Sequence, residues 1–369
     1  MTAAPLMQDS RALSTKTRAR FSLLDGLRFA AALGVVFFHF TSKQQEAWGG
    51  RSVPEIFPHL HTFTALGYYG VHLFFVISGF VILMTAWGKD IPSYVASRIS
   101  RLYPAYIVSV LAASLLLGVI WLEQKNLTFY QIAVNLTMTQ GAFGIDHIDG
   151  VYWTLWVELR FYVLIAALML VGLTRQRILA FAALWPVAGA LARTTNSHFL
   201  VEALNAEYSA LFAGGMAIYL LTRNHRDVAA WLVLAMTALL AVAVPGRDSQ
   251  AKLEGATGVG FSGHTTGLVI LGCFALVALA TLTPLKNVHV KWLTLLGLLT
   301  YPLYLVHEWW GWWMIHLLSG RLPDLVVLCI TLAFVGVLAA LIYYLVERPF
   351  GRPVRSIIER SLRGLATNR

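Results

Sequence analysis

The stretch LLDGLRFAAALGVVFFH, residues 23–39, decides the fold of this chain. Every residue between Arg28 and His39 is apolar or glycine. Their separation of eleven residues is about three helical turns, so both side chains lie on one helix face, roughly 16 Å apart along the axis. A charged or titratable side chain at membrane depth is costly and normally faces a partner, a substrate or a water-filled cavity. The stretch therefore predicts a membrane-spanning helix with a cation near one end and a candidate base near the other.

The composition extends this prediction to the whole chain. Of the 369 residues, 58% are hydrophobic and only 12% are charged, which is about half the charged fraction of soluble domains. The two cysteines, Cys273 and Cys329, lie in apolar runs, so we expect neither a disulfide framework nor a metal site. The chain is therefore predicted to be an all-α, polytopic integral membrane protein.

Ten apolar segments are predicted to cross the membrane. They lie near residues 22–42, 67–87, 104–123, 151–173, 178–192, 208–222, 228–245, 263–284, 292–318 and 325–346. The fifth and sixth are short for a crossing of about 20 residues, so they can be tilted, interrupted or extended into residues 193–207. This division gives an N-terminal segment at 1–21, a transmembrane domain at 22–346 and a basic tail at 347–369.

The distribution of basic residues predicts the orientation. Of the 28 Lys and Arg residues, 19 fall in the segments that would face the cytoplasm and 7 in the external loops. This asymmetry follows the positive-inside rule and predicts a multi-pass protein of the inner (plasma) membrane with both termini cytoplasmic. The net charge of +10 then reflects topology, and we expect no nucleic-acid partner. The tail arginines Arg352, Arg355, Arg360 and Arg363 would suit the anionic headgroups of membrane lipids.

Three arginines are expected toward the cytoplasmic side. Arg28 begins the first span, and Arg98 and Arg101 lie in SRISRLYP, residues 97–104, in the predicted connection from the second span to the third. Pro104 would then start the third span. A spacing of three puts Arg98 and Arg101 on one face of a helical turn, and paired guanidinium groups suit phosphate. The simpler interpretation is that these arginines only set orientation.

A second polar layer is expected toward the outside. It contains His39, Glu158, His307 and Glu308, with Tyr304 on a helix face that it can share with either of the last two. A histidine beside a carboxylate can act as a general base with an orienting partner. The simpler interpretation is a histidine that hydrogen-bonds between helices. His39 is the strongest candidate because Arg28 shares its face.

The second predicted span carries two further polar side chains. His72 lies near its start, and we give it no role beyond helix packing. Ser78 and Gly79 occur in FFVISGF, residues 74–80, which predicts a close approach of another backbone or of a thin ligand. A Gly-Xaa-Ser-Xaa-Gly motif is absent, so Ser78 is not an esterase nucleophile.

Six motifs along the chain resemble those of the membrane-bound acyltransferase-3 family of O-acyltransferases. They are LDGLR at 24–28 followed by His39, GVHLFFVISGF at 70–80, RISRLYP at 98–104, WTLWVE at 153–158 followed by FY at 161–162, YPLYLVH at 301–307 and ERPF at 347–350. They occur in the family's order and cover nearly the whole chain.

The resemblance implies ten transmembrane helices, a cytoplasmic acyl-CoA donor and an acceptor presented at the outer face. The family's essential histidine falls on His39, its first-span arginine on Arg28, and its arginine pair on Arg98 and Arg101. The chain departs from the family at His72, which is often aspartate, and at two variable positions, Arg160 and Glu308. The SGNH domain of many relatives is not part of this sequence, so the chain would finish the transfer itself or use a separate partner.

The predicted function is O-acylation of a hydroxyl on a cell-surface or exported glycan, with acetyl as the expected acyl group. His39 would deprotonate the acceptor or be acylated itself, and Glu158 would orient or stabilise its imidazole. Ser78, Tyr304 and His307 are candidate oxyanion donors or acceptor-positioning residues. No permanently bound cofactor is expected, and acyl-CoA, acetyl-CoA above all, would be the co-substrate.

The acceptor stays open at this stage, between a lipid-linked sugar, a glycan and a secondary metabolite. Glycan assembly or export proteins are candidate partners.

Two other classes of protein fit part of the pattern. A proton-coupled transporter of a small solute would also place charges inside a bundle, although no repeat symmetry is visible. A haem or quinone protein could use His39, His72 and His307 as ligands.

Overall fold

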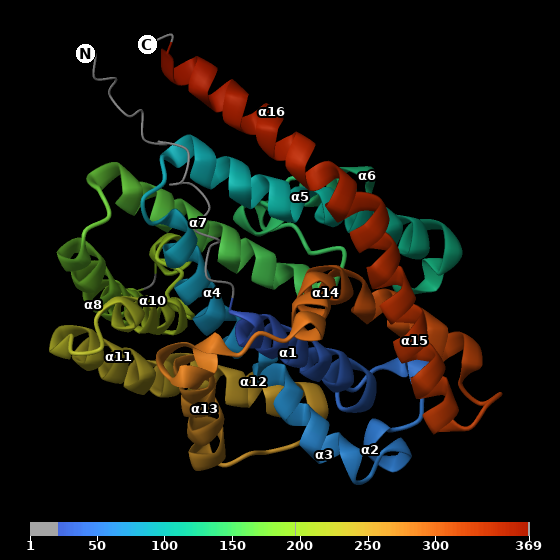
Figure 1. Ribbon diagram of the computed structural model, residues 1–369. Coiled ribbons are helices and arrows are strands. Elements are labelled where there is room, and N and C mark those ends of the chain that lie inside the picture. The colour runs from blue at the N-terminus through green and yellow to red at the C-terminus, as the bar shows by residue number, and fades with distance from the viewer. Residues whose placement is uncertain (1–20, 196, 368–369) are drawn as a thin grey trace, which may run out of the picture.

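Helices make up almost all of the regular structure of this protein (Figure 1). The computed structural model describes residues 21–195 and 197–367, and no β-strand occurs among them. The predicted all-α class is therefore confirmed. The basic residues of the predicted N-terminal segment, Arg11, Lys16, Arg18 and Arg20, lie outside the described residues.

Within the described residues, ten long helices overlap the ten predicted spans. They are α1 (Ser22–Thr41), α4 (Gly70–Ala86), α5 (Ile91–Leu115), α7 (Trp153–Val171), α8 (Arg175–Ala192), α10 (Ser209–Arg223), α11 (Val228–Ala241), α13 (Gly263–Leu282), α14 (Lys291–Leu318) and α15 (Asp324–Ile342). The remaining helices are α2 (Val53–Ile56), α3 (Leu60–Ala65), α6 (Phe129–Asn135), α9 (His198–Ala203), α12 (Arg247–Thr257) and α16 (Arg348–Thr367).

Not every long helix is apolar enough to count as a span by itself. Seven helical segments of the described chain have the length and hydropathy to cross a membrane. The helices α8, α10 and α14 do not reach those limits. Helix α10 has only 15 residues, and α14 mixes its leucines with tryptophan, tyrosine and histidine. A multi-pass membrane protein is supported, whereas the number of ten spans and their orientation stay predictions.

The connections gather on two opposite sides of the bundle. On one side, the Ser22 hydroxyl donates to the Val288 carbonyl at 2.5 Å, which ties the start of α1 to the α13–α14 connection. On the same side, Arg175 at the start of α8 binds Asp227 at the start of α11 through two hydrogen bonds of 2.6 Å. We call this side the inner face and the opposite side the outer face.

The outer face is held together in the same way. Arg51, after α1, binds Asp324 at the start of α15 at 2.5 Å, and Arg193 binds Asp248 of α12 at 2.7 Å. The backbone N–H of Gln44 donates to the carbonyl of Ala256 at 2.9 Å. Successive long helices therefore run in opposite directions between these two faces, while the number of membrane crossings stays a prediction.

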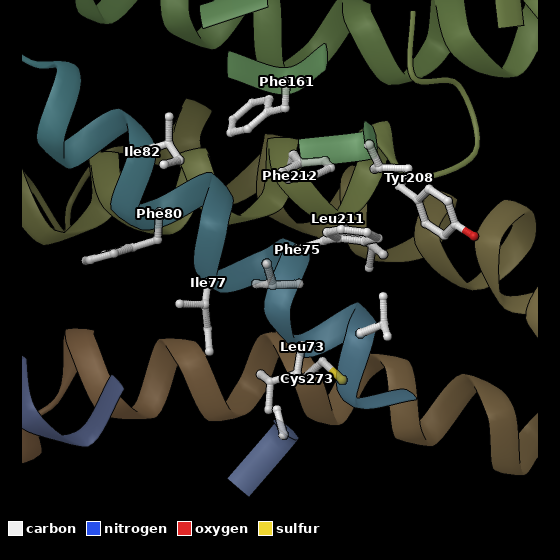
Figure 2. Packing of buried hydrophobic residues seen from close by; sticks show 14 of the residues in the cluster. Leu73, Phe75, Ile77, Phe80, Ile82, Phe161, Tyr208, Leu211, Phe212 and Cys273 are labelled. Carbon is white, nitrogen blue, oxygen red and sulfur yellow. The ribbon is translucent and has the colours of Figure 1, made fainter. Parts of the chain in front are cut away.

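The most extensive contact between two helices lies where α4 crosses α10. Figure 2 shows Phe75, Phe161 and Phe212 among the side chains that pack at this crossing. Phe212 of α10 stacks on Phe161 of α7 at 4.3 Å between ring centroids and contacts Phe75 of α4 at 4.8 Å. Gly79 touches the Phe212 backbone so closely that a Cβ atom would overlap its carbonyl. The close approach predicted from FFVISGF is confirmed, and the neighbour is α10.

The third span begins earlier than predicted. Helix α5 starts at Ile91, because the Asp90 side chain accepts from the Ser93 N–H at 3.2 Å and Pro92 occupies the first turn. The expectation that Pro104 starts this span is wrong, since it lies inside α5. Arg98 and Arg101 are consequently side chains of α5 itself and face the bundle from a regular helix.

Two other segments continue beyond the predicted spans. Helix α11 passes through a π-helical turn at Val242–Gly246, which contains Pro245, into α12. Helix α15 passes through a second such turn, Tyr343–Glu347, into α16. The predicted basic tail is therefore helical over the described residues, and it lies along α5 (Figure 1).

Candidate active site

His39 lies near the outer end of α1, where its imidazole has a defined protonation pattern. The Nδ1 atom of His307 lies 2.9 Å from the Tyr304 carbonyl and must carry a hydrogen, which leaves its Nε2 as an acceptor. That Nε2 atom lies 3.2 Å from Nδ1 of His39, which also lies 2.9 Å from the Val35 carbonyl. Since both neighbours accept, His39 Nδ1 donates, and its Nε2 is the nitrogen free to take a proton.

Glu308 is the carboxylate partner of His39. Its Oε1 atom lies 3.4 Å from His39 Nε2 and 2.6 Å from the ammonium of Lys43. The Glu308 side chain is 2% exposed, so its charge acts on His39 with little screening by water. Trp312 donates from Nε1 to the His39 carbonyl at 3.2 Å, and its ring lies 4.8 Å from the Lys43 ammonium. These contacts fix both members of the pair.

A second carboxyl group, Asp149, lies against Glu308. The Oδ2 atom of Asp149 and the Oε2 atom of Glu308 are both buried, and neither accepts a hydrogen bond from a described residue. Burial and the Glu308 carboxylate raise the pKa of Asp149 well above its usual value. A proton held between the two carboxyl groups would satisfy both atoms, and with Lys43 it would leave the surroundings of His39 close to electrically neutral.

A cavity of about 210 Å³ opens beside His39, Lys43 and Glu308. Most of its walls are apolar or aromatic: Val35, Phe38, Tyr68, Val71, Val151, Trp153 and Tyr304. A site of this kind can hold a small organic group next to a base, with aromatic faces available for a sugar ring. We call it the outer cavity.

A second cavity continues inward from the first. Val71 and Tyr304 line both, so the two are neighbours. The Tyr304 hydroxyl at this junction lies 3.0 Å from that of Thr154. Beyond the junction the walls include Arg28, Ser78 and Glu158. We call it the middle cavity.

Glu158 does not contact His39, contrary to the sequence hypothesis that it orients this imidazole. Its Oε1 atom accepts from the Ser78 hydroxyl at 3.0 Å and from the Tyr162 hydroxyl at 2.7 Å. Both Glu158 and Ser78 line the middle cavity together with Arg28, on the inner side of Tyr304. The structure therefore assigns the imidazole contact to Glu308 and places Ser78 among the groups around Arg28.

The three predicted arginines converge farther inward. Arg28, Arg98 and Arg101 line one small cavity with Ser78 and Glu158. Arg98 lies over the Tyr162 ring at 5.8 Å, which restricts its guanidinium group. Arg101 also lines a larger cavity of about 590 Å³ between α1, α5, α14 and α16. We call this last one the inner mouth.

The four cavities form one series from the inner mouth to His39. The inner mouth shares Arg101 with the small arginine-lined cavity and Tyr301 with the middle cavity. The small cavity shares Arg28, Ser78 and Glu158 with the middle cavity. The middle cavity shares Val71 and Tyr304 with the outer cavity. The Arg28–His39 pair of the opening motif therefore lies along this series. His72 lies apart from it, with Nε2 2.7 Å from the Ser249 hydroxyl.

Sequence reasoning missed Lys43 and Asp149 as members of the site. Lys43 follows His39 by four residues and lies just beyond the end of α1 at Thr41, and the predicted span also ended before it. Asp149 lies just before the WTLWVE motif, and nothing in that loop indicated that it would be buried. Glu308 was noted beside His307, although its variable position in the family gave no reason to pair it with His39.

Comparison with known families gives a match that covers most of the chain. Residues 21–345 match the Acyltransferase domain family Acyl_transf_3. The chain belongs to this acyltransferase family. Its membership confirms the predicted resemblance and places the protein among membrane-embedded transferases of acyl groups.

Curated relatives share shorter regions with this family member. Acyltransferase MdmB of Streptomyces mycarofaciens is 33% identical over 99 residues, or 27% of this chain and 24% of that protein. Protein 2 in the picA locus of Rhizobium radiobacter is 34% identical over 27% of this chain and 46% of its own length. ORF330 of Acidianus two-tailed virus, provisionally named an acetyltransferase, is 28% identical over 42% of each chain.

The chain thus spans less than half the length of each of these curated relatives. No solved structure matches it. The comparisons support the enzyme class, an acyltransferase, and the membrane setting. They do not identify the donor, the acceptor or the residues that carry out the reaction.

Proposed function

We propose that this acyltransferase moves an acyl group, acetyl in the first instance, from acyl-CoA at the inner face to a hydroxyl group in the outer cavity. The observation that carries this proposal is the series of four adjoining cavities. The series begins among arginines and ends at His39. A long donor with an anionic head and a reactive far end matches the order of charges along this series. It must widen the two narrow links on binding, which have volumes of about 10 Å³ beside the arginines and about 50 Å³ in the middle cavity.

The donor's anionic end is held by the arginines. Arg98 and Arg101 lie one helical turn apart on α5 and present two guanidinium groups to the pyrophosphate of CoA. Arg28 stands where the charged part of the series ends. Outward from it the walls become apolar, with Val71, Phe74 and Leu155, which suits the pantetheine arm. Arg28 and His39 are roughly 16 Å apart along α1, a distance that this extended arm can span.

The reaction then takes place in the outer cavity. The acceptor hydroxyl gives its proton to Nε2 of His39 as its oxygen forms a bond to the thioester carbonyl carbon. The carbon–sulfur bond breaks, and the departing sulfur takes the proton back from His39 as free CoA. The Glu308 carboxylate, 3.4 Å from Nε2, stabilises the imidazolium that exists between these two steps. The Tyr304 hydroxyl, which lines both cavities, is our candidate donor to the oxyanion.

General base catalysis fits His39 better than an acyl-histidine intermediate. Its Nδ1 atom is occupied by His307 and the Val35 carbonyl, so Nε2 is the only nitrogen that could be acylated. An acyl group on Nε2 would displace the close Glu308 contact, whereas a proton strengthens it. His307 acts here by fixing the tautomer of His39.

The acceptor that we propose is a sugar hydroxyl on an exported or lipid-linked glycan. The rings of Tyr68 and Trp153 line the outer cavity, and aromatic faces of this kind suit the apolar side of a sugar ring. Lys43 is the one cation among the lining residues, and its charge is held by Glu308. The inner (plasma) membrane is the setting in which a cytoplasmic donor and an exported acceptor meet across one protein.

The test combines a deletion strain with two histidine variants. Mass spectrometry and NMR of surface glycans should show one acyl increment lost in the deletion strain, restored by the wild-type protein and not by His39→Asn. His72→Asn is the matched control, because His72 is also buried but lies away from the cavities. It should restore the increment. Restoration by His39→Asn, or accumulation of an unmodified solute as the only phenotype, would overturn the proposal and favour a transporter.

A further inference from the structure

The inner mouth is built by a helix that the site described above does not use. Arg348 and Arg352 of α16 line this cavity opposite Arg101 of α5. Their spacing of four residues places both on one helix face, and Arg348 lies over the Tyr344 ring at 5.8 Å. Tyr301 and Tyr343 contribute aromatic walls to the same cavity. The tail helix therefore presents two guanidinium groups to the start of the donor's path.

Specific contacts hold α16 against α5. The Ser93 hydroxyl donates to Glu359 at 2.7 Å, and Arg363 binds both Glu359 and Asp90 at 2.9 Å. Asp90 is also the N-cap of α5, so the docking site is part of the helix start. Helix α16 is thus fixed at its far end, while its first two turns stand over the inner mouth. This arrangement positions Arg348 and Arg352 through the fold instead of leaving them on a loose tail.

The charges that line the inner mouth favour the binding of an anion. Arg101, Arg348 and Arg352 supply three positive charges. Asp25 and Glu347 are the two carboxyl groups among the lining residues. At least one positive charge is therefore left over in the mouth. The adjoining cavity adds Arg28 and Arg98 against the single carboxylate of Glu158, so the balance there is positive as well. A cavity of about 590 Å³ with this balance has room for a nucleotide and its phosphate.

We propose that Arg348 and Arg352 of α16 bind the 3′-phosphate on the ribose of acyl-CoA, with Tyr301 or Tyr343 against the adenine. This inference deepens the proposed function and rests on it. The order of groups along CoA supports the assignment, because the 3′-phosphoadenosine lies beyond the pyrophosphate from the thioester. If Arg98 and Arg101 hold the pyrophosphate and His39 receives the thioester, the 3′-phosphate falls in the inner mouth.

Headgroups of anionic lipids offer the same chemistry to these arginines, and the sequence hypothesis assigned the tail to them. The two ligands differ in what they require. A lipid headgroup would meet α16 at the membrane surface and would not depend on the cavity. A CoA phosphate must enter the cavity and stay connected to the thioester. Substrates that lack the 3′-phosphate, measured in neutral membranes, therefore separate the two sources.

The experiment compares acetyl-CoA with 3′-dephospho-acetyl-CoA on purified full-length protein in nanodiscs of neutral phosphatidylcholine. Turnover and CoA binding by calorimetry are measured for the wild type, Arg348→Gln with Arg352→Gln, and Arg360→Gln. Arg360 is the control because it lies on α16 outside the mouth. We expect the KM of the wild type for acetyl-CoA to be about tenfold to a hundredfold lower than its KM for 3′-dephospho-acetyl-CoA. The difference corresponds to the loss of charge-assisted hydrogen bonds to one phosphate. The double variant should lose that preference, and Arg360→Gln should keep it.

Three outcomes would overturn the inference. A double variant that keeps the wild-type preference would exclude these arginines from the 3′-phosphate. Equal use of both donors by the wild type would exclude a binding site for the 3′-phosphate and would leave the proposed function intact. An effect of the double variant that appears only when phosphatidylglycerol is added would assign α16 to lipid. Absence of any CoA binding by the wild type would instead overturn the proposed function itself. Because a double variant can fail to fold, Arg352→Lys serves as a second test and should retain much of the preference, since it keeps the charge.

Discussion

Replacing Glu308 with glutamine tests the chemistry of the outer cavity most sharply. The substitution keeps the shape of the side chain and removes a charge that lies 3.4 Å from His39 Nε2. At an effective dielectric constant of about 20, a unit charge pair at that distance interacts by about 5 kcal/mol. The Lys43 ammonium, 2.6 Å from the same carboxylate oxygen, offsets part of this stabilisation of the imidazolium.

We therefore expect kcat to fall by about 100-fold to 1,000-fold in Glu308→Gln, within the usual range for losing assisted proton transfer. The KM for acyl-CoA should change little, because Glu308 does not line the cavities that hold the arginines. The assay is steady-state turnover of acetyl-CoA in proteoliposomes, with thermal stability measured on the same preparation. Glu308→Asp should recover part of the rate, since it restores the charge.

Glu158→Gln is the matched control, because Glu158 is the carboxylate that lines the middle cavity, near Arg28 and away from His39. Its substitution should raise the KM for acyl-CoA more than it lowers kcat. A folded Glu308→Gln protein whose kcat stays within tenfold of the wild type would refute the pairing of Glu308 with His39. So would a Glu158→Gln protein with the larger loss in kcat.

Three further substitutions test the path and the fold. Val71→Phe should block the junction of the outer and middle cavities. Acetyl transfer should therefore fall at least tenfold, while binding of CoA, measured by calorimetry, persists. Unchanged transfer would mean that the donor does not pass this junction. Gly79→Ala should lower the free energy of unfolding by about 1–3 kcal/mol, because its Cβ would overlap a carbonyl of α10. Gly272→Ala is the control, because a Cβ there meets open space. Its free energy of unfolding, measured by denaturation in detergent, should equal that of the wild type. Arg175 holds the pKa of Asp227 below its usual value, so the stability that this pair contributes is present above the unfolded pKa of about 3.9 and is lost as pH falls through the folded pKa. Asp227→Asn should flatten that part of the profile of melting temperature against pH, and an unchanged profile would contradict the assignment.

The sequence predicted those features that depend on one helix at a time. The Arg28–His39 spacing and the close approach at Gly79 each follow from periodicity or residue size within a single segment. These predictions hold in the structure, where α1 carries both side chains along the cavity series and α10 crosses at Gly79. The family motifs supplied the acyltransferase class, which spacing alone could not give.

Contacts between helices were the part that the sequence could not supply. Glu158 and Glu308 are both carboxylates in apolar helices, and only the packing of α14 against α1 brings Glu308 to His39. The burial of Asp149 depends in the same way on how the loop before α7 meets α14. The tail was predicted from composition as a lipid-binding segment, and its docking on α5 depends on contacts far apart in the chain, such as Ser93 with Glu359.

The central claim is that the donor enters at the inner face and reacts at His39 near the outer face. Sealed vesicles with a known orientation of the protein test it directly, when radiolabelled acetyl-CoA is supplied to one side only and the acceptor glycan is present on the other. We expect label on the glycan only when acetyl-CoA is at the inner face, and none with His39→Asn. Equal labelling from donor at the outer face, or labelling that persists in His39→Asn, would contradict the account.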